Sequence, residues 1–435
     1  MSKHTEERTA RAVALAALHR IENGEHAGNA LATELADGLL SSRDRAFVTE
    51  LVQGTTRMQR SCDHLIKPFL KTDIDAAVRS TLRLGTYQLA YLGTPRHAAV
   101  SETVDIATNK VRGLVNAVLR KVADLVASKP GWPSRAVELS YPDWLMRKAI
   151  ADWGEEGDAM LAAMNDPERT QARLDGYVQG LASEWVVDEV DALRPSAGGV
   201  VLDLCAAPGG KTTGLSDSWQ LRIGAELDGR RVGLLASVAE RHGHHIPVVR
   251  SDAAFPPFRP QSADAVLVDA PCSGLGALGR RSDARWRISA DDVLRLASLQ
   301  RKLIRSAAEV VRPGGVLVYS VCTFTLSETT GVADKFTEEH PEFEPVELTG
   351  EHWRSLGTGG IVLPQDHGTD AMAVFAWRRV AGAHLEEPVV EDVVVEDVVV
   401  EDVVVEDVVV EDVVVEDVVV EDVVVEDVVV EDVVV

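Results

Sequence analysis

The chain has 435 residues, of which 46% are hydrophobic and 26% are charged, and its formal net charge at pH 7 is −25. That length allows two or three domains with buried cores. The four cysteines are far apart and form no Cys-x-x-Cys pair, which argues against a zinc site and a disulfide scaffold. No secretory signal and no run of about 20 apolar residues is present in the sequence. We therefore expect a cytoplasmic protein with free thiols, no metal and no membrane partner, of unknown oligomeric state.

Most of the negative charge lies in nine copies of Glu-Asp-Val-Val-Val at residues 391–435, and the chain without them has a net charge of −7. Residues 1–135 contain 19 basic and 14 acidic residues, whereas residues 136–390 contain 25 basic and 37 acidic residues. The net charges of these two segments are therefore +5 and −12. The first segment is the better candidate for contact with a polyanion.

Helical periodicity dominates the first part of the chain. Apolar residues recur every three or four positions, as in Leu84, Tyr87 and Tyr91. This spacing predicts an all-α domain of six or seven helices over residues 1–133. A Lys-Pro-Gly-Trp-Pro break ends it, and residues 134–170 are predicted to be a helical linker or subdomain.

The pattern changes at about residue 171, where short β-branched runs alternate with segments of helical length. The expected strands are residues 200–202, 222–226, 247–249, 265–268 and 316–320. This alternation predicts an α/β Rossmann-like domain over residues 171–382, with a parallel sheet and helices on both faces. Ligands of such sheets bind beyond the carboxyl ends of the strands.

The tail, residues 383–435, is predicted to be a disordered, low-complexity acidic repeat. A five-residue period gives no steady apolar face on a helix or a strand, and the paired acids repel one another. Neutral sequence drift and an acidic interaction tail are the two explanations for it.

A turn of small residues follows the first expected strand of the sheet. It comprises Cys205, Ala206, Ala207, Pro208, Gly209, Gly210 and Lys211. Backbone amides in such a turn can approach a ligand closely at the start of the next helix. The turn lacks P-loop spacing, and a strand-to-helix turn without a ligand is the alternative. Glu226 favours a nucleotide site, because an acid at the end of the next strand can accept hydrogen bonds from ribose hydroxyls. Asp252, after the third strand, is placed to accept from an adenine amino group.

Two more of the expected strands end at or next to cysteines. Asp269 is followed by Ala-Pro-Cys272, and Cys322 follows the last expected strand with Val321 in between. Either cysteine alone would be read as a small buried residue. Because parallel strands present their carboxyl ends at one edge, we expect both cysteines to project into one crevice beside Asp269.

The motifs resemble those of a known family. Residues 135–380 resemble the Sun/Fmu-type (RsmB-like, NOL1/NOP2/Sun) RNA cytosine carbon-5 methyltransferases, through the motifs at 205–211 and 269–273. Residues 1–130 resemble the NusB-like RNA-binding domain that bacterial members carry. The stretches that carry this second resemblance are residues 44–55, 82–89, 97–100 and 113–120.

The resemblance implies that S-adenosyl-L-methionine is the cofactor. By position, residues 205–211 would line its methionine and ribose, Glu226 would hold the ribose hydroxyls, and Asp252 would meet the adenine. Glu226 departs from the family pattern, which usually has Asp there, but it keeps an acceptor for a diol.

The resemblance also implies a catalytic set. Cys322 matches the family's nucleophile, Cys272 matches the cysteine that assists product release, and Asp269 would lie between the cofactor and the base. A thiolate that adds to carbon 6 of cytosine makes carbon 5 nucleophilic, and the base must leave its stack to be reached. Val321 replaces the Thr that commonly precedes the nucleophile. The sequence does not reveal what lowers the pKa of the Cys322 thiol.

A cationic segment follows the second cysteine motif and is the candidate RNA contact. It contains Arg280, Arg281, Arg285, Trp286 and Arg287. Phosphate contact and base stacking are the predicted roles, with a solvated surface loop as the alternative.

A Gly-x-Gly-x-x-Gly pattern at residues 274–279 matches the dinucleotide fingerprint. Pro271 and Cys272 separate it from the preceding strand, and Asp291 and Asp292 come too early for the ribose acid. We therefore reject a dehydrogenase.

The favoured function is methylation of a cytosine in RNA, with 16S ribosomal RNA preferred because of the NusB-like domain. A transfer RNA substrate and a non-catalytic RNA-binding protein of ribosome assembly remain the alternatives.

Overall fold

A computed structural model describes residues 8–36, 38–166, 171–195 and 198–381. The predicted disorder of the repeat tail lies outside these residues. Within the described ranges, every helix is too short or too polar to cross a bilayer.

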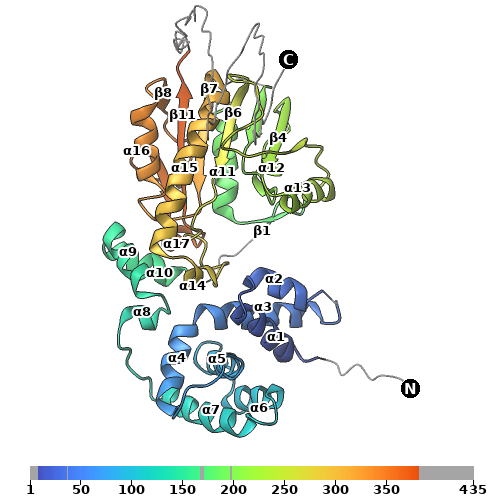
Figure 1. The fold of residues 1–435 in the computed structure, drawn as a ribbon, viewed down its shortest axis with the longest axis vertical. Helices are drawn as coiled ribbons and strands as arrows, with labels where there is room; N and C mark the ends of the chain where they lie inside the picture. Colours follow the sequence, from blue (N-terminus) through green and yellow to red (C-terminus); the bar gives the residue numbers. More distant parts are fainter. Residues whose placement is uncertain (1–7, 37, 167–170, 196–197, 382–435) are drawn as a thin grey trace, which may run out of the picture. The chain divides into compact units, whose positions relative to one another are not determined.

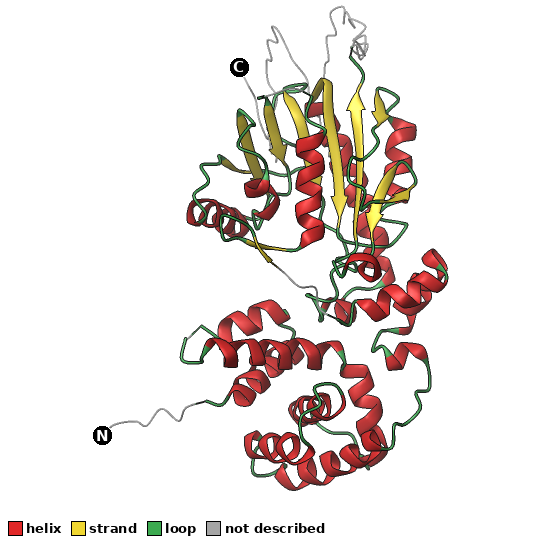
Figure 2. Ribbon diagram, turned by 180° about the vertical axis from the view of Figure 1, so that it is seen from behind, coloured by secondary structure: helices red, strands yellow, loops and turns green. Residues whose placement is uncertain are grey.

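The first part of the chain is helical, as Figures 1 and 2 show. Its elements are α1 (Ala10–Glu22), α2 (Ala27–Glu34), α3 (Ser42–Arg57), α4 (Gln59–Ile66), the 3-10 helix η1 (Lys67–Phe69), α5 (Ala76–Ala90), α6 (Arg96–Ile106) and α7 (Arg112–Ala127). These seven α-helices agree with the predicted six or seven. Leu82, Tyr87 and Leu119 belong to one buried cluster and Leu15 and Leu51 to another, so the apolar stripes of the sequence are the helix faces that pack together.

Short elements connect this helical part to the sheet. They are α8 (Arg135–Glu138), α9 (Asp143–Trp153), α10 (Glu155–Ala163) and a hairpin of β1 (Gln171–Ala172) and β2 (Val178–Gln179). Leu145 of α9 and Met160 of α10 are fully buried in the same cluster as side chains of the main sheet. The connecting helices therefore pack on the sheet domain rather than forming a loose linker.

The main sheet has the strand order β5-β4-β3-β6-β7-β11-β10-β9, and β8 also pairs with β11. The strands are β3 (Val200–Asp203), β4 (Leu221–Glu226), β5 (Val248–Arg250), β6 (Ala263–Asp269), β7 (Val311–Val321), β8 (Phe343–Pro345), β9 (Arg354–Leu356), β10 (Gly359–Val362) and β11 (Met372–Arg379). The five predicted strands correspond to β3–β7 and pair in parallel. The sheet is nevertheless mixed, because β8–β11 add an antiparallel edge that the sequence analysis did not identify.

Helices cover both faces of this sheet. They are α11 (Leu181–Ala192), α12 (Gly210–Gly214), α13 (Gly229–Arg241), α14 (Ala284–Arg287), α15 (Ala290–Val310), α16 (Thr330–Glu339) and α17 (Pro364–His367). In Figure 1, α15 and α16 lie in front of the sheet and α11 lies behind it. Alternate residues of β6 explain this arrangement, since Val266 and Val268 face the α15 cluster whereas Leu267 faces the α11 cluster. A strand buried on both faces is a continuous apolar run, which is how it appears in the sequence.

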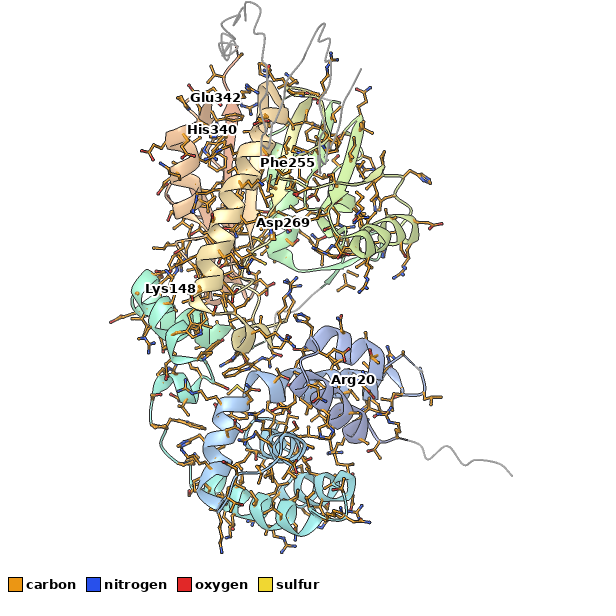
Figure 3. All side chains as sticks on the ribbon, viewed as in Figure 1. Arg20, Lys148, Phe255, Asp269, His340 and Glu342 are labelled. Atoms are coloured by element: carbon orange, nitrogen blue, oxygen red, sulfur yellow. The ribbon has the colours of Figure 1, made fainter. Side chains whose placement is uncertain are left out.

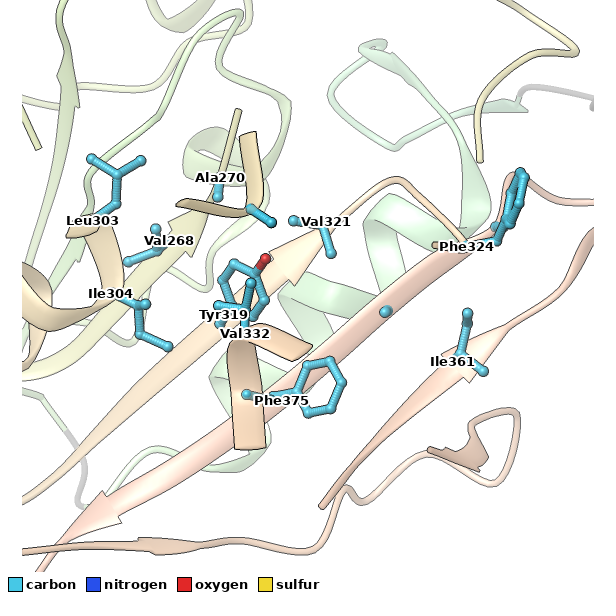
Figure 4. Close-up of a cluster of buried hydrophobic side chains, with 14 of the residues drawn as sticks. Val268, Ala270, Leu303, Ile304, Tyr319, Val321, Phe324, Val332, Ile361 and Phe375 are labelled. Carbon is cyan, nitrogen blue, oxygen red and sulfur yellow. The ribbon is translucent and has the colours of Figure 1, made fainter. Parts of the chain in front are cut away.

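The core under α15 fixes the end of the sheet at which the cysteines lie. Figure 4 shows Val268, Tyr319 and Val321 among its buried side chains, with Ile304 of α15 and Phe375 of β11. Tyr319 and Val321 are 0% exposed and point to the same face of β7. Their packing anchors β7 up to the residue that precedes Cys322.

Candidate active site

Acidic residues end three neighbouring parallel strands. Asp203 is the last residue of β3, Glu226 of β4 and Asp269 of β6. The chain passes from β3 outward through β4 to β5 and then returns to β6 on the other side of β3. That reversal of strand order lies at the carboxyl ends of β3 and β6, the place where ligands of such sheets bind.

The turn after β3 lies at this end of the sheet. Ala206, Ala207, Gly209 and Gly210 are buried, and the Ala207–Pro208 peptide is cis. Gly209 has a φ of +115°, and a Cβ there would lie 2.9 Å from a methyl group of Leu235. Only glycine fits both the backbone conformation and the space, so the sequence requirement for small residues has a local steric cause.

Glu226 and Asp252 lie at the ends of the next two strands. Glu226 is 5% exposed, and its Oε1 accepts a hydrogen bond of 3.1 Å from the backbone N–H of Asp228. Its Oε2 lies 3.3 Å from Arg231 Nη1 and accepts no hydrogen bond from the described residues. Asp252 accepts from the backbone N–H of Ala254 through Oδ1. Glu226 therefore retains acceptor capacity toward a ligand.

Arg231 of α13 ties this acid to the glycine turn. Its Nη2 donates a hydrogen bond of 2.6 Å to the carbonyl oxygen of Ala207, while its Nη1 faces Glu226. The turn and the end of β4 are thus held together by one guanidinium.

Asp269 is held on both carboxylate oxygens. Lys211 Nζ donates to its Oδ2 at 2.7 Å, and Ser320 Oγ donates to its Oδ1 at 2.8 Å. Burial alone would lower the pKa of Lys211, but the charge and hydrogen bond of Asp269 raise it overall, so the side chain stays an ammonium. Figure 3 labels Asp269, whose side chain is 31% exposed. This ion pair joins the glycine turn to the Asp-Ala-Pro-Cys motif.

The two cysteines meet beyond the ends of β6 and β7. Their Sγ atoms are 3.3 Å apart. The hydrogen bond from Cys272 lowers the pKa of the Cys322 thiol, while the same bond and burial raise that of Cys272. Arg281 and Lys211 further favour the Cys322 thiolate, whereas burial and Asp269 oppose it. The hydrogen bond and the nearby cations therefore favour ionisation of Cys322 over ionisation of Cys272.

Asp203 is a residue of this site that the sequence analysis missed. It is 1% exposed, and burial raises its pKa to about 7. Thr212 Oγ1 donates to its Oδ2 at 2.6 Å, whereas its Oδ1 has no partner among the described residues. Its position as a polar residue at the end of a buried strand, like Glu226 and Asp269, was the available signal.

The predicted RNA-contact segment needs one correction. Arg280 and Arg281 are exposed, and Arg280 pairs with Asp370. Arg285, in contrast, is 0% exposed and lies with its guanidinium carbon 4.0 Å from the centre of the Tyr141 ring. A buried guanidinium cannot reach an RNA phosphate, so the structure argues against an RNA contact for Arg285.

The neighbours of Arg285 are occupied by the helical part of the chain. Trp286 Nε1 donates a hydrogen bond of 2.8 Å to the carbonyl oxygen of Thr56. Arg287 Nη2 donates one of 3.0 Å to the carbonyl oxygen of Gly24. In return, Arg57 of α3 donates a hydrogen bond of 2.9 Å from Nη2 to the carbonyl oxygen of Gly279. These bonds give Trp286 and Arg287 a structural role, and only Arg280 and Arg281 retain the RNA prediction.

Comparison with known proteins agrees with the fold. A family profile described as 16S rRNA methyltransferase RsmB/F matches residues 190–377, and a NusB family profile matches residues 8–124. Ribosomal RNA small subunit methyltransferase B of Thermus thermophilus is 35% identical over 86% of this chain and 98% of its own length. Probable ribosomal RNA small subunit methyltransferase B of Bacillus subtilis is 30% identical over 85% and 98%. The crystal structure of PH0851 shares the fold over 87% of this chain and 100% of that one, with 21% identity and a TM-score of 0.69. The predicted fold class, a NusB-like helical domain followed by an α/β Rossmann-like methyltransferase domain, is thereby confirmed.

Proposed function

Because the chain belongs to the 16S rRNA methyltransferase RsmB/F family, we propose that it methylates carbon 5 of a cytosine in ribosomal RNA through a covalent bond from Cys322 to carbon 6. The observation that carries this proposal is the pair of sulfur atoms 3.3 Å apart, at the edge of the sheet where the acids also lie. An RNA methyltransferase that attacked a nitrogen or a ribose oxygen would have no use for a thiolate with a second thiol beside it.

The residues around the crevice fit S-adenosyl-L-methionine, the methyl donor of this family. The buried Oε2 of Glu226, which lacks a hydrogen bond within the described structure, is an acceptor suited to a ribose hydroxyl. Gly209 and Gly210 let the turn pack closely against Leu235 and Tyr177, and Asp252 is an acceptor suited to the adenine amino group. When bound, the cofactor supplies an electrophilic methyl group on a sulfonium.

Cys322 is the proposed nucleophile. Its thiolate adds to carbon 6 of the cytosine, and the electron pair displaced toward carbon 5 makes that carbon able to accept the methyl group. A base then takes the carbon-5 proton, the freed electron pair re-forms the carbon 5–carbon 6 double bond, and the Cys322 sulfur leaves as a thiolate. Cys272 holds its proton beside that sulfur and is proposed to assist this release.

Asp269 is proposed to accept a hydrogen bond from the amino group of the cytosine. Its two oxygens are oriented by Lys211 and Ser320, so the carboxylate does not need to reorganise when the base arrives. The Lys211 ammonium also balances the charge of Asp269 next to the thiolate.

Two surfaces are proposed to hold the RNA. Arg281 is exposed close to Cys322 and is suited to a phosphate flanking the flipped base. The helical part, with its net charge of +5 over residues 1–135, is proposed as a second and less specific contact.

Cysteine substitutions test the mechanism. We expect Cys322→Ala to abolish methyl transfer, and Cys272→Ala to leave a protein–RNA adduct that survives denaturing electrophoresis. Cys62→Ala, which changes a buried thiol in the helical part, is the matched control and should keep both activity and release. Wild-type activity in Cys322→Ala would eliminate the covalent mechanism.

Mapping of 5-methylcytosine tests the substrate. RNA from cells with and without the protein should differ at a cytosine of small-subunit ribosomal RNA. A difference confined to transfer RNA would replace the proposed substrate, and no difference in either RNA would favour a non-catalytic protein.

A further inference from the structure

Glu328 is a fully buried acid that the proposed mechanism does not use. It lies in the loop between β7 and α16, is 0% exposed, and accepts five hydrogen bonds. We propose that Glu328 is a positioning residue that holds the Cys272 loop against the Cys322 loop and so fixes the contact between the two sulfurs. This inference deepens the proposed function and rests on it for the role of the cysteines.

The five donors come from both cysteine loops and from α15. Glu328 Oε1 accepts from the backbone N–H of Ser273 at 2.8 Å and from Gln300 Nε2 at 3.0 Å. Its Oε2 accepts from Ser273 Oγ at 2.5 Å, Thr325 Oγ1 at 2.9 Å and Thr323 Oγ1 at 3.1 Å. Ser273 directly follows Cys272, and Thr323 directly follows Cys322. One carboxylate therefore binds the residue next to each sulfur.

The surroundings of Glu328 restrain it in turn. The Tyr319 hydroxyl lies within hydrogen-bond distance of two acceptors. They are the backbone carbonyl oxygen of Glu328, at 2.7 Å, and Gln300 Oε1, at 3.1 Å. Gln300 Nε2 also donates 3.0 Å to the carbonyl oxygen of Pro271, the residue before Cys272. The loop that carries Cys272 is thus tied on both sides of the cysteine to a network centred on Glu328.

A carboxylate is suited to this place because all five of its partners are donors. A carboxylate only accepts, whereas a Gln amide would offer one oxygen and turn an NH₂ group toward donors. Glu328→Gln keeps the size of the side chain but leaves several of these donors without an acceptor. We expect the Cys272 loop to shift, which weakens the hydrogen bond from Cys272 to Cys322.

The charges around the sulfurs agree with this role. After the hydrogen bond with Cys322 and burial, the negative charges of Cys322 and Glu328 raise the pKa of Cys272. The groups that face Cys322 itself are Cys272, Arg281, Asp269 and Lys211. Glu328 therefore acts on the thiolate through Cys272, not by direct contact.

Alkylation of Cys322 by iodoacetamide tests the inference on the full-length protein without any RNA. The rate is measured by mass spectrometry from pH 5 to pH 10, so that it reports the thiolate fraction. In Glu328→Gln we expect Cys322 to react about tenfold more slowly at pH 7, with a higher titration midpoint, because a hydrogen bond to the anion is weakened. In the methyl-transfer assay, kcat should fall by about tenfold or more while the KM for S-adenosyl-L-methionine stays within about twofold.

Glu189→Gln is the matched control. Glu189 is 1% exposed and its carboxylate accepts four hydrogen bonds, from Thr349, Gly350 and Trp353, in the α11 cluster. This variant carries the same chemical change in a buried site and should leave the Cys322 titration unchanged. Thr325→Val, which removes one donor to Glu328, should shift the midpoint in the same direction by less.

A folded Glu328→Gln protein with the wild-type titration of Cys322 would overturn the inference. If Glu328→Gln does not fold, an unchanged midpoint in Thr325→Val would overturn it instead. Failure of the proposed function would give a different experimental result from failure of this inference. A wild-type protein that makes no 5-methylcytosine would refute the methylation chemistry, while the alkylation rates would still decide whether Glu328 sets the contact between the sulfurs.

Discussion

Replacement of Arg285 by Met separates a structural guanidinium from an RNA-binding one. Arg285 is 0% exposed, packs on Tyr141, and donates from Nη1 to Asn165 Oδ1 at 3.0 Å and to the carbonyl oxygen of Ser140 at 3.2 Å. Met fills a similar volume without charge or donors. The variant therefore removes the interactions of the guanidinium with little change in packing.

The expected loss follows from opposing contributions. A desolvated cation–π contact is worth about 2 kcal/mol, and each hydrogen bond from a charged donor about 1.5–3 kcal/mol. Burial lowers the pKa of Arg285 to about 10, and this shift corresponds to about 3 kcal/mol that disfavours the charged guanidinium. Because the favourable interactions are larger, we expect Arg285→Met to lower the free energy of unfolding by about 2–5 kcal/mol.

Urea denaturation followed by tryptophan fluorescence measures this loss. Arg295→Met is the control, since the Arg295 side chain is 67% exposed and pairs with the partly exposed Asp292, and such surface pairs are worth about 1 kcal/mol or less. The salt dependence of RNA binding gives the second measurement. Arg281→Gln should reduce the slope of log K against log salt by about one, and Arg285→Met should leave it unchanged. An Arg285→Met protein with wild-type stability and a reduced slope would refute this reasoning.

Two further predictions concern the crevice. Asp203 has a pKa of about 7 in the folded protein against 3.8 for a free Asp, so its contribution to the free energy of unfolding should fall between about pH 4 and pH 7, by about 1.4 kcal/mol per pH unit. Thermal melting of Asp203→Asn and wild type across this range should show the variant gaining relative stability as the pH rises, and a constant difference would contradict the assignment. In Gly276→Ala, the new Cβ would lie 2.2 Å from the carbonyl oxygen of Ala371 and 2.9 Å from that of Cys322. Methyl transfer should therefore fall by at least tenfold, whereas Gly233→Ala, which meets open space on α13, should keep wild-type activity.

The sequence predicted the parallel half of the sheet because each of its strands is a short apolar run bounded by turn residues. The antiparallel strand β11 has the same apolar character, yet a short buried run does not reveal its partner or direction. The sheet was therefore expected to be wholly parallel, and four strands were missed.

The candidate site was predicted as a set of residues but not as a geometry. The register that pairs Asp269 with Ser320 is what brings Cys272 and Cys322 together, and register between strands 50 residues apart is a tertiary property. Glu328 gave no local signal, because its five donors come from three separate segments. The buried state of Arg285 was equally hidden, since Tyr141, Ser140 and Asn165, which contact it, lie at least 120 residues earlier in the chain.

The hydrogen bonds between residues 279–287 and α3 show that the two domains are not independent of each other. The loop that begins at Cys272 runs on, within a dozen residues, into a segment anchored by Arg57, Thr56 and Tyr141. An N-terminal truncation would strip partners from Trp286 and Arg285 and leave a catalytic loop with one free end. In the proposed mechanism, the first domain is therefore part of the scaffold that holds the Cys272 loop, and joining the methyltransferase domain to another module would require a substitute for that anchor.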